Sequence, residues 1–131
     1  MIENFIQHLI PILAGTLGAA VPLIFAGLGE LVAERTGVLN LGVEGMMLAG
    51  AIAGFAAAAE SGHGALIGLP AGALAGAAMA SIFALFSLSL TANQAACGLA
   101  LTIFGIGLSA FIGQSYISYS LPGLKPIAIP L

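Results

Sequence analysis

Residues 65–90 read ALIGLPAGALAGAAMASIFALFSLSL, a run of 26 residues without a single Asp, Glu, Lys or Arg. A helix that crosses the hydrocarbon core of a bilayer needs about 20 apolar residues, so this run predicts a membrane-spanning helix with some tilt. The run lies within a wider region, residues 61–124, that contains no charged residue at all. A water-soluble fold could not bury that much apolar surface.

Two further apolar runs precede this one, at residues 9–29 and 38–59, and one follows it, at residues 95–113. The first is longer than the apolar core of a signal peptide, and no Lys or Arg precedes it, so we expect it to be a retained helix. A tail at residues 114–131 contains Pro122, Pro126 and Pro130 and suits a membrane interface. We therefore predict an all-α integral membrane chain, with about four transmembrane helices of a larger multi-helix bundle in the cell membrane.

The composition excludes several classes of function. The 131 residues are 60% hydrophobic and 5% charged, with a mean hydropathy of +1.17. Two basic residues cannot neutralise a phosphate backbone, so nucleic-acid binding is excluded. One Cys and two His at unsuitable spacings suggest no zinc site. Without a nucleophile–base pair or a phosphate-binding loop, the sequence supports no catalytic, cofactor-binding or metal-binding residue on this chain.

Small residues recur every four positions in the predicted helices. Gly68, Gly72 and Gly76 begin such a stripe in the run at 65–90, and we predict that they pack against another helix. In membranes, small residues let helix backbones approach closely, and this replaces the missing hydrophobic driving force. The other two stripes consist of Gly42, Met46, Gly50, Gly54 and Ala58, and of Gly105, Ser109 and Gly113.

Asn40 and Glu44 are polar residues within the run at 38–59, and a helix would place them on one face. A carboxylate at membrane depth is costly, so Glu44 should face protein or a water-filled path. Glycines at 37, 42 and 45 lower the helix propensity here, so the backbone could be unwound. Two interpretations stay open: the pair lines a translocation path, or it hydrogen-bonds neighbouring helices and sets their register.

Asn93 and Gln94 form the next polar break, before the run at 95–113. They suit either the polar start of a re-entrant segment on the translocation path or an ordinary interfacial loop. We keep both residues as candidates for the path, together with Asn40 and Glu44.

Two blocks of the sequence resemble a known family. Residues 34–51 read ERTGVLNLGVEGMMLAGA, and residues 92–101 read ANQAACGLAL. Both blocks, in this order, resemble the membrane subunits of ABC importers of the branched-chain amino acid and simple-sugar permease family, and the nucleoside-type permeases most of all. The likeness runs from about Leu17 to the C-terminus. Family members are about twice this length or more, so we expect the chain to be an N-terminal portion of such a permease.

The resemblance implies a permease subunit without ATPase activity. In the family, two permease subunits form the pathway, two cytoplasmic ATP-binding subunits hydrolyse ATP, and an extracytoplasmic solute-binding protein delivers the solute. The chain itself would bind no cofactor. Its solute would be small and polar, such as a nucleoside or a sugar.

Two other classes of function remain as alternatives. An ion-coupled transporter or a proteolipid could use Glu44 as an intramembrane proton carrier, although the basic polar loop typical of proteolipid hairpins is missing. A structural membrane subunit without a solute path would use the same polar residues only for packing.

Overall fold

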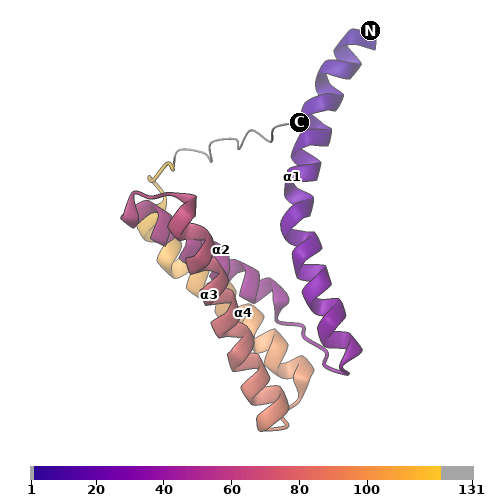
Figure 1. The fold of residues 1–131 in the computed structure, drawn as a ribbon, viewed down its shortest axis with the longest axis vertical. Coiled ribbons are helices and arrows are strands. Elements are labelled where there is room, and N and C mark those ends of the chain that lie inside the picture. The colour runs from indigo at the N-terminus through magenta and orange to yellow at the C-terminus, as the bar shows by residue number, and fades with distance from the viewer. Residues whose placement is uncertain (1, 122–131) are drawn as a thin grey trace. The chain divides into compact units, whose positions relative to one another are not determined.

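The computed structural model describes residues 2–121 of the chain, and within them it contains helices and no strand. The long helices are α1 (Ile2–Arg35), α2 (Val43–Ser61), α3 (Ala65–Ala84) and α4 (Gln94–Gly113), as labelled in Figure 1. A π-helical turn, η1 (Leu85–Ser89), extends α3, and a 3-10 turn, η2 (Gln114–Tyr116), extends α4. All four long helices have the length and apolar composition to cross a membrane. The predicted all-α membrane fold is therefore confirmed.

The predicted helix boundaries differ from the observed ones at the N-terminal end of the first helix and around the first polar break. The first helix is longer than residues 9–29 at both ends, and the second begins at Val43 rather than at 38. The third covers residues 65–84 as α-helix before the π-helical turn, and the fourth begins one residue earlier than predicted. Residues 122–131 of the predicted interfacial tail, including its three prolines, lie outside the described residues.

The chain divides into two units, with the boundary between Leu39 and Asn40. In the first unit, α1 is the one long helix that the structure describes, and its apolar side chains are exposed, as Leu17 is at 70%. Glu30 and Arg35 lie in its last two turns, where charged side chains suit the end of a membrane-spanning helix.

The second unit is a bundle in which α2 packs against both α3 and α4. Gly50 lies against Gly72, and Gly54 lies against Gly68, so α2 and α3 run in opposite directions. A Cβ atom on Gly72 or on Gly54 would lie 2.8 Å from the facing carbonyl oxygen. The absence of side chains at this crossing therefore allows backbone-to-backbone contact, as is usual for helix pairs in membranes.

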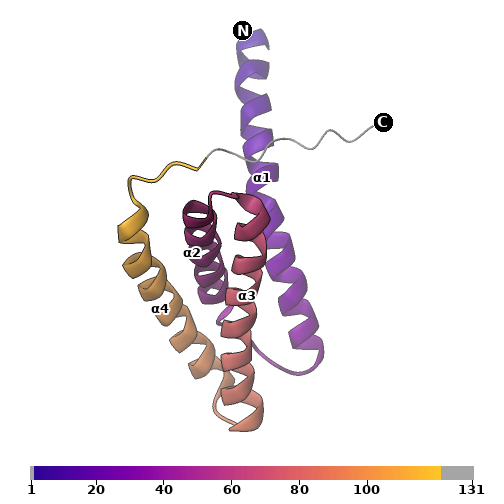
Figure 2. The ribbon, with the colours of Figure 1, turned by 60° about the vertical axis from the view of Figure 1, so that its left-hand side comes forward.

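The helices α2 and α4 run in the same direction and also meet through glycines. A Cβ atom on Gly105 would overlap the backbone of Gly45, and further along the two helices the side chain of Ile52 lies against Gly113. The helices α3 and α4, in contrast, touch at few positions. Figure 2 shows them joined at the lower end of the view and separated by α2 at the upper end.

The bundle has a small core and a large apolar surface. Its buried apolar residues are Met46, Ala49, Ala58, Met79, Phe83 and Leu101. On the outer faces, Leu66 is 79% exposed and Phe111 is 77% exposed. Such a surface is stable against lipid tails or other membrane helices and unstable against water.

Tyr116 closes the end of the bundle at which α2 and α4 terminate. Its hydroxyl donates a hydrogen bond to the Glu60 carboxylate. Its ring packs edge-on against Phe55 and Tyr119, with ring centroids 6.0 and 5.8 Å away. Tyrosines suit a membrane interface because the ring is apolar and the hydroxyl is polar.

Candidate functional site

The helix α1 ends in a glycine cap. The Gly37 amide donates to the Glu34 carbonyl at 2.9 Å, and the Val38 amide donates to the Ala33 carbonyl at 3.1 Å. Gly37 has a φ of +82°, the left-handed conformation that this pair of bonds requires. The ERTG sequence at residues 34–37 therefore stops the helix, and the backbone stays non-helical as far as Gly42.

A second local motif starts α2, in the other unit. The side-chain oxygen Oδ1 of Asn40 accepts a hydrogen bond from the Gly42 amide at 2.9 Å, which forms an Asx turn. The Asn40 amide nitrogen Nδ2 lies 3.7 Å from the Met46 sulfur. The Gly42 carbonyl then accepts from the Met46 amide and begins the helical hydrogen-bond series. We call residues Asn40–Gly42 the Asn40 turn.

The Asn40 turn packs directly on α4. The Thr102 hydroxyl donates to the Leu41 carbonyl at 2.9 Å, across 61 residues of sequence. One helical turn earlier, Gly98 is buried, and a Cβ atom there would lie 2.8 Å from the Leu41 nitrogen and 2.9 Å from the Gly42 nitrogen. Gly98 therefore provides the space for the turn, and Thr102 provides a hydrogen bond to it.

These contacts place the turn within the span of α4. Gly98 and Thr102 follow Gln94, the first residue of α4, by four and eight residues. At 1.5 Å per residue, they lie about 6 and 12 Å along the helix axis from its start. Non-helical backbone at such a depth in a membrane is tolerated only where it is buried in protein or lines a water-filled cavity. The contacts with Gly98 and Thr102 meet the first condition, and a role of the Asn40 turn in lining a pathway stays a prediction.

The expectation that Asn40 and Glu44 share a helical face is wrong, because α2 begins after Asn40. Asn40 is half-buried in the turn, whereas Glu44 lies exposed in the first turn of α2. A carboxylate at that position interacts favourably with the positive end of the helix dipole. Of the three glycines where unwound backbone was expected, Gly37 and Gly42 lie in non-helical backbone, whereas Gly45 lies within α2.

Asn93 and Gln94 lie at the start of α4. The Asn93 side chain accepts from the Ala96 amide at 3.0 Å and so caps the helix, and Gln94 is the first helical residue. Thr91, just before, has a φ of +50°, a strained conformation for a β-branched residue. The structure thus gives Asn93 a defined capping role, and whether it also contacts a solute stays a prediction.

The three glycines predicted to pack on a neighbouring helix differ in their surroundings. Gly68 and Gly72 lie at the crossing with α2. At Gly76, the nearest neighbour of an added Cβ atom would be the Met46 carbonyl oxygen, 3.9 Å away, which is ordinary van der Waals contact. The close part of the crossing therefore includes the first two glycines of the stripe.

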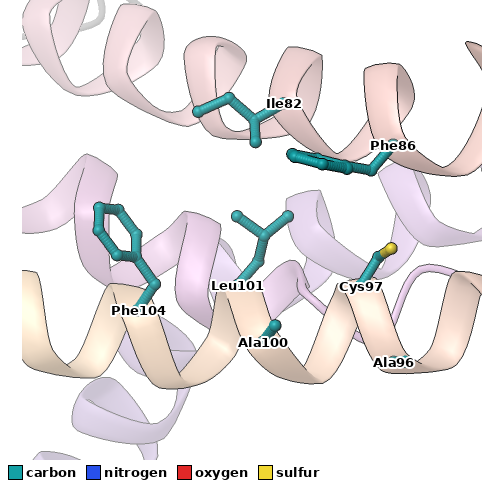
Figure 3. A pocket seen from close by; sticks show the side chains of 7 residues that line it. All are labelled: Ile82, Phe86, Ala96, Cys97, Ala100, Leu101 and Phe104. Atoms are coloured by element: carbon teal, nitrogen blue, oxygen red, sulfur yellow. The ribbon is translucent and has the colours of Figure 1, made fainter. Parts of the chain in front are cut away.

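An apolar groove of about 420 Å³ opens between α3 and α4, as Figure 3 shows. Ile82 and Phe86 point into it from α3 and η1, and the residues that line it from α4 are Ala96, Cys97, Ala100, Leu101 and Phe104. The lining side chains are apolar, and Cys97 adds a thiol to them. Among residues 2–121, no three His, Cys, Asp or Glu side chains gather as a metal site would need.

Gly98 and Thr102 were not among the residues predicted from the sequence to form the site. The sequence does contain a signal for both residues. Thr102 is a polar residue and the only Thr in an apolar run, one helical turn before Gly105, and Gly98 lies four residues before Thr102. Polar residues within membrane helices usually face protein.

Residues 12–121 match the family described as the permease component of the branched-chain amino acid transport system. The chain belongs to this permease family. The predicted family resemblance is therefore confirmed, and four spans together with family membership make the chain a multi-pass protein of the cell membrane.

Three relatives show the level of similarity. The chain is 44% identical, over 92% of its length, to a Haloferax volcanii protein named "Putative glucose ABC transporter permease protein". It is 33% identical over 83% of its length to a guanosine ABC transporter permease of Bacillus subtilis, and 30% identical over 86% to a nucleoside ABC transporter permease of Lactococcus lactis. It spans 36% to 37% of the length of these relatives. No solved structure matches the chain significantly.

Proposed function

We propose that this permease-family chain forms part of the solute pathway of an ATP-driven ABC importer for a small polar solute, such as a sugar or a nucleoside. The observation that carries the proposal is the 44% identity to the Haloferax protein over 92% of the chain. The similar proteins from Bacillus and Lactococcus are named for guanosine and for nucleosides, which supports the same class of solute.

The Asn40 turn gives a physical reason to expect a pathway for a polar solute. A polar solute that crosses a bilayer needs hydrogen-bonding groups at membrane depth, and a continuous helix offers only side chains. The turn interrupts the helical backbone and carries a side-chain amide at about the depth of Gly98 in α4. We infer that Asn40 and Glu44 line the pathway and that Asn93 and Gln94, at the start of α4, lie toward one end of it.

In the proposed importer, a separate ATP-binding subunit hydrolyses ATP, and this chain binds no cofactor. The importer pairs the chain with a second permease subunit, identical or related, and with an extracytoplasmic binding protein that delivers the solute. The ABC transporter names of the relatives support this assembly.

Uptake by cells tests the proposal. Deletion of the gene that encodes the chain should abolish uptake of labelled glucose or of labelled guanosine, and the intact gene should restore it. The restored uptake should disappear when cellular ATP is depleted while the proton gradient is maintained. Uptake that persists without ATP but stops when a carbodiimide modifies Glu44 would instead indicate the ion-coupled alternative, and restored growth without any solute uptake would indicate a structural subunit.

A further inference from the structure

The hydroxyl of Thr102 bonds differently from those of three other Ser and Thr residues in the described helices. Thr16, Ser81 and Ser87 each donate to the carbonyl four residues earlier in their own helix, at 2.7 to 2.8 Å. This is the usual partner of a Ser or Thr hydroxyl in a membrane helix. Thr102 instead donates to the Leu41 carbonyl of another segment.

The surroundings of this bond are shaped for it. Gly98 is buried and leaves room for the backbone of Leu41 and Gly42, and a Cβ atom on Gly42 would in turn lie 3.2 Å from the Gly98 carbonyl oxygen. Gly45, at the start of α2, packs against the backbone of Leu101 and Thr102. The non-helical turn is therefore held on α4 by close backbone contact on both sides of one hydrogen bond, from the Thr102 hydroxyl to the Leu41 carbonyl.

We propose that Thr102 is a positioning residue that sets the depth and orientation of the Asn40 side-chain amide in the solute pathway. Thr102 acts through the Leu41 carbonyl: the hydroxyl fixes the Leu41–Gly42 peptide, and the N–H of that same peptide donates to Oδ1 of Asn40 in the Asx turn. The inference rests on the proposed function, because it assumes that Asn40 lines the pathway. It makes Thr102 a determinant of solute selectivity without direct solute contact.

Two substitutions separate the hydroxyl from the shape of the side chain. Thr102→Val removes the hydroxyl and keeps the branched shape, and Thr102→Ser keeps the hydroxyl. Thr16→Val is the matched control, because it removes a hydroxyl–carbonyl bond of similar length that lies within one helix. Thr102→Ala replaces the valine variant if that variant does not reach the membrane.

The first readout is selectivity in cells that carry the full transporter. For glucose or guanosine, whichever is taken up, we compare Vmax/KM with that of its deoxy analogue, 2-deoxyglucose or 2′-deoxyguanosine. A smaller amount of folded protein lowers both values equally and leaves their ratio unchanged. Thr102→Val should change the ratio by about threefold to tenfold, the range expected for one hydrogen bond in a membrane protein. Thr102→Ser and Thr16→Val should keep the wild-type ratio.

The second readout is hydrogen–deuterium exchange of the purified protein, and it does not depend on transport. Amides of residues 40–43 should exchange faster in Thr102→Val than in wild type or in Thr102→Ser. An unchanged ratio and unchanged exchange in Thr102→Val would overturn the positioning role, as would a serine variant as altered as the valine variant. If neither solute is taken up by wild type, the proposed function fails, and the exchange experiment still decides whether Thr102 holds the turn.

Discussion

At the scale of single residues, the site depends on positions where a side chain is absent. The Asn40 turn reaches α4 because Gly98 offers only a hydrogen atom toward the Leu41 and Gly42 nitrogens. Glycine normally weakens a helix relative to alanine, by about 0.8–1.0 kcal/mol, so its presence in the interior of α4 has a structural reason. That reason is the approach of a second backbone.

Gly98→Ala should therefore destabilise the protein despite the better helix propensity of alanine. The new methyl group would meet backbone atoms at 2.8 and 2.9 Å, and such overpacking costs about 1–3 kcal/mol. Gly107→Ala, in the same helix, is the control, because a Cβ atom there meets nothing within 4 Å. Thermal unfolding in detergent should give a lower midpoint for Gly98→Ala alone. Equal midpoints for the two variants would contradict this packing.

At the scale of the helices, α2 is the element that joins the bundle. It meets α3 through Gly50 and Gly54 and meets α4 through Gly45, while α3 and α4 are connected mainly by the turn that follows η1. In η1, the Leu90 amide donates to the Leu85 carbonyl, five residues earlier, and this widens the last turn of the third helix. The groove of Figure 3 lies where α3 and α4 face each other without α2 between them.

The stripe on α3 allows a comparison within one helix. Gly72→Ala should weaken the α2–α3 contact, because its Cβ atom would lie 2.8 Å from the Gly50 carbonyl oxygen. Gly76→Ala should be neutral or slightly stabilising, because its nearest neighbour lies 3.9 Å away and alanine favours the helix. The amount of folded protein in membranes and the unfolding midpoint measure both effects. A Gly76→Ala variant as unstable as Gly72→Ala would show that the crossing extends further than the structure places it.

At the scale of the whole molecule, the helices that the structure describes have largely apolar outer faces. The chain spans 36% of the length of the Haloferax relative, and both α1 and the outer faces of the bundle expose large apolar side chains. The family and the apolar surface together agree with a bundle that lipid and further membrane helices surround.

The pathway role predicts a specific response to charge at Asn40. Asn40→Asp keeps the oxygen that accepts from the Gly42 amide, so the turn should still form, but it removes the Nδ2 donor and adds a negative charge. We expect uptake per transporter to fall by about tenfold or more, because a charge at membrane depth binds water strongly and a carboxylate cannot donate the hydrogen bond that the amide offers to a solute. Glu44→Gln should have a smaller effect, since Glu44 lies exposed at the start of α2. Normal uptake by Asn40→Asp would favour the packing interpretation.

The helices could be predicted largely from the sequence, because an apolar run of about 20 residues with at most one charge has few other solutions in a membrane. The non-helical backbone near Gly37 and Gly42 could also be predicted, since the glycines lower helix propensity there. The relation of Asn40 to Glu44 could not, because it depends on the residue at which α2 begins. The start of α2 is set by the Asx turn of Asn40 and by the contact of Gly42 with Gly98, 56 residues later in the sequence.

The sequence by itself determined that this is a helical membrane protein of the permease family, because hydropathy and the motif blocks are properties of consecutive residues. Only the tertiary structure decided which glycines meet, that Asn40 stands in a turn at the depth of Gly98, and that Thr102 bonds to Leu41. Those facts depend on the rotation and register of one helix against another. Small residues at equal spacing allow many such arrangements, and close packing of the three helices selects one.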